Sequence, residues 1–102
     1  MIYNKLVRDK IPAIIEANGQ KPVTRILDEE EYMASLEQKL DEEVQEFHRD
    51  QNLEELADIL EVIYALTEAK GYSVAELAEA CARKRNVRGG FRDRIFLISN
   101  EG

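Results

Sequence analysis

The sequence has 102 residues, few aromatic residues (7%), no tryptophan, and a formal net charge of −7 at pH 7. This length allows one domain with its own core, and the acidic balance argues against a protein that binds the nucleic-acid backbone. We therefore expect a single domain over residues 1–102 that does not bind nucleic acid. The abundance of Ala, Leu, Glu and Lys favours an all-α fold.

The charge is distributed unevenly along the chain. Residues 28–61 contain 14 acidic and 2 basic residues, a net charge of −12, whereas the rest of the chain has 7 acidic and 12 basic residues, or +5. An acidic middle between basic ends suits a metal site beside an anionic ligand. Solvent-exposed helix faces give the same pattern, so the charge alone leaves both interpretations open.

Cys81 is the only cysteine, so the chain forms no internal disulfide, which fits a reducing compartment. The first residues lack the apolar segment of a signal peptide, and no apolar run approaches the roughly 18 residues that cross a bilayer. We expect a cytoplasmic protein without membrane contact. Because Cys81 lies among Leu77 and Ala82, we expect it to be a small core residue.

The first predicted helix begins near Lys10, with Asp9 as its candidate N-cap and Pro12 in its first turn. Asn18 and Gly19 end this helix. Residues 22–27 then alternate between apolar and polar, which predicts a short strand, and residues 94–99 near the other end of the chain have strand character too. These two segments are candidates for a short two-stranded pairing.

Two long helices are predicted in the middle of the chain. Asp28 and Glu31 have the spacing of a capping box, and the helix that they start runs to about Arg49. Asn52 starts the next helix, which Gly71 closes. The apolar residues of the first long helix recur every three or four positions and predict one buried stripe: Tyr32, Met33, Leu36, Leu40, Val44 and Phe47.

The second long helix is apolar in nearly every direction, which predicts burial on more than one side. A chain this small supplies little cover of its own, so we expect a second subunit, in a homodimer or homotetramer. Asp58 and Glu61 then lie in an otherwise buried stretch. Buried carboxylates without partners are costly, so these two residues should be ligands or tightly paired.

Ser73 and Glu76 have capping-box spacing and start a last helix, which Gly89 and Gly90 break. Residues 83–94 contain six basic residues and one acidic residue. Arginine forks and lysine ammonium groups bind phosphate oxygens well, although cations are also favourable at any helix C-terminus. The elements together predict a bundle of about four helices.

The acidic residues of the two long helices form pairs spaced three apart, so that each pair shares one side of its helix. The pairs are Glu43 with Glu46 and Glu55 with Asp58. A short connection makes the helices antiparallel, so both pairs can face one cleft, where a hard divalent cation is our candidate for the missing positive charge. Lys39 is spaced to pair with Glu43. Glu42 and Glu61 are left open as outer ligands, a base or salt-bridge partners.

These features resemble the all-α nucleoside triphosphate pyrophosphohydrolases, the superfamily of MazG-like proteins, dimeric dUTPases and phosphoribosyl-ATP pyrophosphohydrolase. The family motif is an ExxE on one helix and an ExxD on the next, matched by Glu43-xx-Glu46 and Glu55-xx-Asp58. The phrases YNKLVRDKIP, LEELADILEVIYAL and RGGFRDRIFL resemble a phosphoribosyl-ATP pyrophosphohydrolase-like branch. The gap between the two motifs is shorter than usual for the superfamily.

The resemblance implies an oligomeric helical bundle whose four motif carboxylates hold Mg²⁺, with Mn²⁺ as a substitute, and serve catalysis. It implies hydrolysis of the α–β phosphoanhydride of a nucleotide to a nucleoside monophosphate and pyrophosphate. The residues implied to bind the substrate phosphates are Lys84, Arg88, Lys5 and Arg8. Two alternatives stay open: phosphoribosyl-ATP hydrolysis in histidine biosynthesis, and a nucleotide- or partner-binding helical module without turnover.

Overall fold

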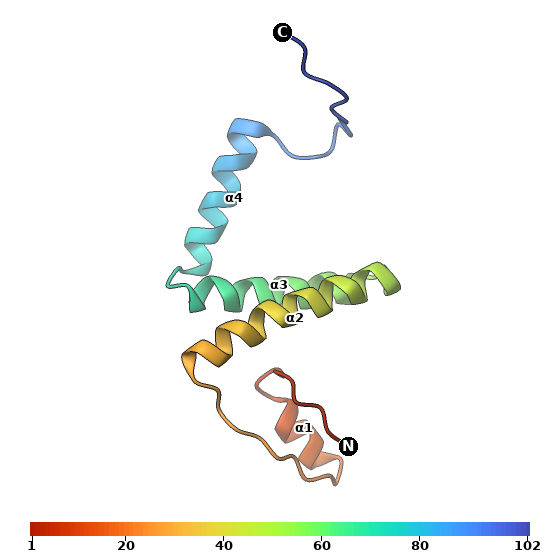
Figure 1. Ribbon diagram of the computed structural model, residues 1–102, viewed down its shortest axis with the longest axis vertical. Helices are drawn as coiled ribbons and strands as arrows, with labels where there is room; N and C mark the ends of the chain where they lie inside the picture. Colours follow the sequence, from red (N-terminus) through yellow and green to blue (C-terminus); the bar gives the residue numbers. More distant parts are fainter.

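The computed structural model describes residues 1–102 and contains four helices and no strand. Figure 1 shows α2 and α3 side by side and antiparallel, with α4 leaving the C-terminal end of α3 and α1 beyond α2. Helix α3 packs against both α2 and α4, whereas α1 packs against no other helix. The predicted all-α fold of about four helices is confirmed. The helices are α1 (Ile11–Ala17), α2 (Glu29–Asp50), α3 (Leu53–Ala69) and α4 (Val74–Arg88).

Local capping signals place the starts of the three longer helices where the sequence predicts them. In each case the side chain before the helix accepts a hydrogen bond from the backbone N–H three residues later: Asp28 from Glu31, Asn52 from Glu55 and Ser73 from Glu76. Helix α1 differs, because its N-cap is Lys10 rather than Asp9 and no side chain caps it.

The turn between α2 and α3 is very short. Gln51 adopts the left-handed conformation, with φ of 54°, and its backbone N–H donates to the Phe47 carbonyl at 2.8 Å. Asn52 then caps α3 immediately. This turn reverses the chain within two residues and brings the last turns of α2 against the first turns of α3.

The predicted pairing of residues 22–27 with residues 94–99 is wrong, because neither segment forms a strand. The two segments lie at opposite ends of the molecule, separated by α2, α3 and α4 (Figure 1). The first segment is instead tied to the start of α2, where both terminal nitrogens of Arg25 donate to the Glu31 carboxylate at 3.1 and 2.7 Å. This contact holds the pKa of Glu31 down to about 2.

The core of the single chain is small and lies between α2 and α3. Only Leu36, Glu43 and Val62 are buried, and one of these three residues is acidic. The radius of gyration is 18.2 Å, whereas a compact domain of this length has about 13 Å. None of the four helices combines the length and apolar character that a bilayer crossing requires.

Cys81 is exposed, so its prediction as a core residue is wrong. The reason is that α4 packs only on α3, near the turn that joins them, and covers little of its own surface. Leu77 and Ala80 are half-buried on that side, whereas Cys81 and every residue after it are exposed.

Candidate metal site

The candidate site lies at the interface between α2 and α3. Glu43 follows the buried Leu36 by seven residues, or about two helical turns, and therefore shares the face of α2 that meets α3. Only 6% of Glu43 is exposed. Glu55 and Asp58 are half-buried on α3, on the same side of that helix as the buried Val62. Three of the four predicted ligands thus come from facing sides of two helices.

The carboxylates of Glu43, Glu55 and Asp58 converge. One oxygen from each lies within 4.8 Å of the oxygens of the other two. Oxygen ligands of an octahedral Mg²⁺ are about 3.0 Å apart when adjacent and about 4.2 Å apart when opposite, since each Mg–O bond is about 2.1 Å long. Three oxygens within 4.8 Å of one another therefore need only small side-chain movements to bind one small, hard cation.

Two of the converging carboxylates have oxygens without a partner. Glu43 Oε2 and Glu55 Oε2 are both buried from solvent and accept no hydrogen bond. Leaving a buried acceptor unsatisfied typically costs about 1–3 kcal/mol, and more for a charged group. A cation bound between the helices would satisfy both oxygens, so the residues present fit a divalent metal ion.

The electrostatics of the site disfavour negative charge in the absence of such an ion. Burial, followed by the nearby Glu46 carboxyl, raises the pKa of Glu43. Burial also raises the pKa of Glu55, with further contributions from the charges of Glu46, Asp50 and Asp58. The fourth predicted ligand, Glu46, is thus a close neighbour of the carboxyls of Glu43 and Glu55, although it is outside the converging set of three.

Lys39, on the same helix as Glu43, supplies one positive charge next to the site. Its ammonium nitrogen lies 3.4 Å from Glu43 Oε1 and 3.8 Å from Glu42 Oε2. The spacing prediction for the Lys39–Glu43 pair is confirmed. Glu42 is therefore a salt-bridge partner of Lys39. Glu61 is exposed and forms no ion pair within the chain, so the expectation that it is buried and tightly paired is wrong for the single chain.

Arg8 is the one predicted phosphate-binding residue that reaches the site. Its guanidinium donates to Asp58 Oδ1 at 2.6 Å, which joins the N-terminal segment to α3 across 50 positions of sequence. Lys5 instead lies near the Tyr3 ring, 5.9 Å from the ring centre. Lys84 and Arg88 are in the last half of α4, which runs away from the α2–α3 pair (Figure 1).

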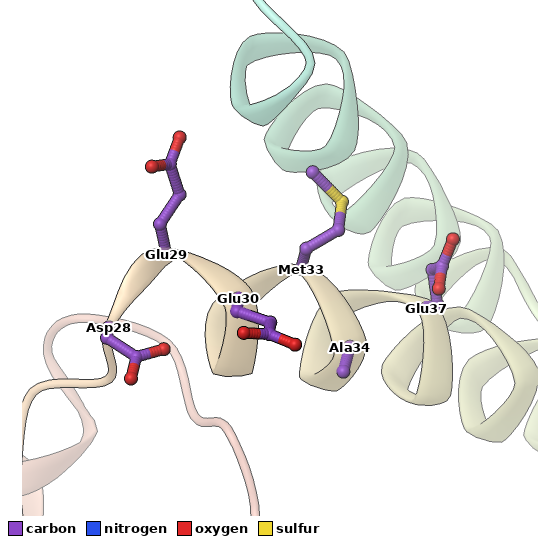
Figure 2. Close-up of a pocket in the computed structure, with 6 residues that line it drawn as sticks. All are labelled: Asp28, Glu29, Glu30, Met33, Ala34 and Glu37. Carbon is purple, nitrogen blue, oxygen red and sulfur yellow. The ribbon is translucent and has the colours of Figure 1, made fainter.

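A hollow in the surface lies elsewhere, at the start of α2. Its volume is about 670 Å³, and Figure 2 shows the six residues that line it: Asp28, Glu29, Glu30, Met33, Ala34 and Glu37. The carboxylates of Glu29 and Glu30 point away from each other in this view, so they do not converge on one position. The hollow also lacks Glu43, Glu55 and Asp58, and it has no part in the candidate site.

The site carboxyls should make the effect of Mg²⁺ on stability depend on pH. Because the pKa values of Glu43 and Glu55 are raised above 4.5, their contribution to stability is complete below that value and is lost as the pH rises through the higher folded values. Mg²⁺ at roughly ten times its Kd should then stabilise the protein by about 1.4 kcal/mol near pH 7.5, and by less near pH 5, where protons compete.

Thermal unfolding with and without Mg²⁺ at the two pH values measures this difference. The Glu43→Gln variant is the matched reference, since it keeps Glu31 and every other titrating group. A Mg²⁺ effect that is equal at both pH values, or equal in wild type and variant, would contradict the assignment.

Comparison with known proteins finds similarity over part of the chain. The chain is 57% identical over 42 residues to a protein of Mycolicibacterium smegmatis described as uncharacterized, and this match covers 41% of the chain and 43% of the relative. No protein-family model matches the sequence, and no solved structure matches it. The comparisons therefore leave the activity to be argued from the residues of the site.

Proposed function

We propose that this protein is a Mg²⁺-dependent nucleotide pyrophosphohydrolase that cleaves the α–β phosphoanhydride of its substrate. The observation that carries the proposal is the pair of buried, unpartnered oxygens on Glu43 and Glu55, beside Asp58. The match of these residues to the ExxE and ExxD motifs supports the same reaction. Mn²⁺ would serve as a substitute, because it accepts the same oxygen ligands.

In this proposal Glu43, Glu55 and Asp58 hold the metal, and Glu46 completes the set. The bound ion supplies charge compensation for the substrate phosphates and lowers the pKa of water at the site. Glu43 is almost fully buried, so the electrostatic interactions of its carboxylate are stronger than they would be in water. Arg8, which contacts Asp58 and is itself exposed, would bind the substrate phosphates.

The ion pair between Arg8 and Asp58 should also affect metal binding. Its guanidinium already neutralises one oxygen of Asp58, so in the absence of nucleotide it competes with a cation for that carboxylate. We expect Arg8→Ala to tighten Mn²⁺ binding without nucleotide a few-fold, because an exposed ion pair is worth up to about 1 kcal/mol. The same change should raise the KM for the nucleotide. Titration of free Mn²⁺ by electron paramagnetic resonance and steady-state kinetics measure the two effects.

Lys10→Ala is the control for Arg8→Ala, because it removes the same charge two residues away from an exposed position that makes no ion pair. Equal Mn²⁺ affinity in Arg8→Ala and Lys10→Ala would show that the contact with Asp58 is an incidental surface pair.

The reaction is tested with a panel of nucleotides, including phosphoribosyl-ATP, in the presence of Mg²⁺ and ¹⁸O-labelled water. The expected products are a nucleoside monophosphate and pyrophosphate, with the label in the monophosphate, since water attacks the α-phosphorus. Label in pyrophosphate would mean attack at the β-phosphorus and would contradict the proposed bond.

Selective turnover of phosphoribosyl-ATP would identify the histidine-pathway reaction as the specific case. Nucleotide binding without product would instead favour a binding module. Failure to bind Mn²⁺ at the site would remove the basis of the proposal altogether.

A further inference from the structure

Helix α3 has an apolar face that nothing in the chain covers. Leu53, Leu56 and Leu60 are 75%, 47% and 44% exposed, and their spacing places them together on one face. At about 100° per residue, this leucine ridge lies opposite the face of Val62 that meets α2. One side of α3 thus meets α2, while the opposite side exposes these three leucines.

The end of the chain is a second uncovered apolar element. Residues 91–98, which we call the C-terminal arm, follow Gly89 and Gly90 and contain five large apolar residues that are at least 76% exposed: Phe91, Ile95, Phe96, Leu97 and Ile98. The arm makes no contact with any helix through a hydrogen bond or an ion pair. It continues beyond α4, away from the α2–α3 pair (Figure 1).

The exposed area indicates how much surface a partner has to cover. The chain exposes 9452 Å², whereas a compact monomer of 11.7 kDa exposes about 5,900 Å². The excess of roughly 3,500 Å² per chain exceeds the roughly 1,000–2,500 Å² that each subunit buries in an obligate homodimer. A second copy of the chain carries the same excess and can supply the missing cover.

Charge complementarity points to the same partner. None of the six basic residues between positions 83 and 94 forms an ion pair within its own chain. Glu54 and Glu61 are exposed on α3 beside the leucine ridge, and neither has a cationic partner. Arg92 and Arg94 are part of the arm and would be available to pair with these two carboxylates if the arm lay along the ridge of another copy.

We infer that the C-terminal arm of one chain packs on the leucine ridge of a second copy, so that two chains exchange arms reciprocally. The apolar residues of the arm bury the ridge, and its arginines pair with Glu54 and Glu61. The ridge lies at the start of α3 and α4 leaves from the end of that helix, so the arm of the same chain points away from it.

Disulfide trapping in the chain of residues 1–102 tests this contact. Cys81 is exposed and is the only cysteine, so Cys81→Ser provides a background without thiols. In that background, a Leu56→Cys chain and an isotopically labelled Ile95→Cys chain are mixed in equal amounts and oxidised, and the cross-linked species are identified by mass spectrometry. The control mixture replaces Ile95→Cys by Ile26→Cys, an equally exposed apolar position in the connector before α2.

The expected result is a mixed cross-link between positions 56 and 95 that forms several-fold more than the control link. Light scattering should show wild type with at least twice the mass of a Leu56→Asp/Leu60→Asp variant of unchanged helical content. The inference is overturned by a mixed cross-link no more frequent than the control, by a monomeric wild type, or by a Leu56→Cys/Ile95→Cys double variant that links only within one chain.

Discussion

Asp58→Asn is expected to lower the rate of pyrophosphate release by roughly 100-fold or more, while the helical content stays unchanged. The substitution keeps the size of the side chain and removes the negative charge from one of the three converging carboxylates. Because Asp58 is only half-buried, the fold loses little. Steady-state kinetics, circular dichroism and Mn²⁺ titration on the same preparation measure these three properties.

Two comparisons isolate the role of Asp58 in this experiment. Glu61→Gln removes a charge one turn further along α3, at an exposed position, and should leave turnover within about two-fold of wild type. Arg8→Ala removes the other member of the Arg8–Asp58 ion pair, so its kinetics show what loss of that pair alone contributes. Retained turnover in Asp58→Asn would exclude Asp58 as an essential ligand.

Glu43→Gln is expected to stabilise the metal-free protein, by on the order of 1 kcal/mol, while it abolishes stabilisation by Mg²⁺. Glu43 is almost fully buried, one of its oxygens has no partner, and its pKa is raised despite the nearby Lys39. The neutral amide therefore fits its surroundings better than the carboxylate when no cation is present. Urea unfolding at neutral pH, with and without Mg²⁺, measures both effects.

Glu42→Gln is the matched control for Glu43→Gln. Glu42 is the adjacent residue and also approaches Lys39, but it lies outside the converging carboxylates. It should leave both the metal-free stability and the response to Mg²⁺ near those of wild type. Destabilisation of metal-free protein by Glu43→Gln would mean that the Lys39 contact outweighs the repulsion among the acids.

The sequence predicts well those features that depend on neighbouring residues. Asp28, Asn52 and Ser73 start helices because each accepts a hydrogen bond from an N–H only three positions away. The same locality places Glu43 and Glu55 on facing helices, since the connection is too short for any arrangement but a reversal. Most of the framework of the candidate site follows from such short-range signals.

Local sequence patterns do not indicate contacts between distant parts of the chain. Alternating apolar residues at 22–27 and 94–99 suit strands, but alternation does not say whether a partner lies within reach, and here three helices separate the two segments. The exposure of Cys81 has a similar origin, because apolar neighbours indicate burial only when another element covers them. The contact of Arg8 with Asp58 crosses 50 residues, so no local spacing identifies it.

The position of Glu43 between Leu36 and the facing helix has a consequence for the fate of the protein in a cell. The carboxylates lie in the interface between α2 and α3, which forms the core of the single chain. The proposed metal ion would therefore stabilise the fold in addition to its role in the reaction. Depletion of divalent ions would then loosen the hairpin of α2 and α3 and expose its backbone to proteases. Under such scarcity the amount of folded protein would fall together with the proposed activity, and a restored supply of the ion would protect newly made chains.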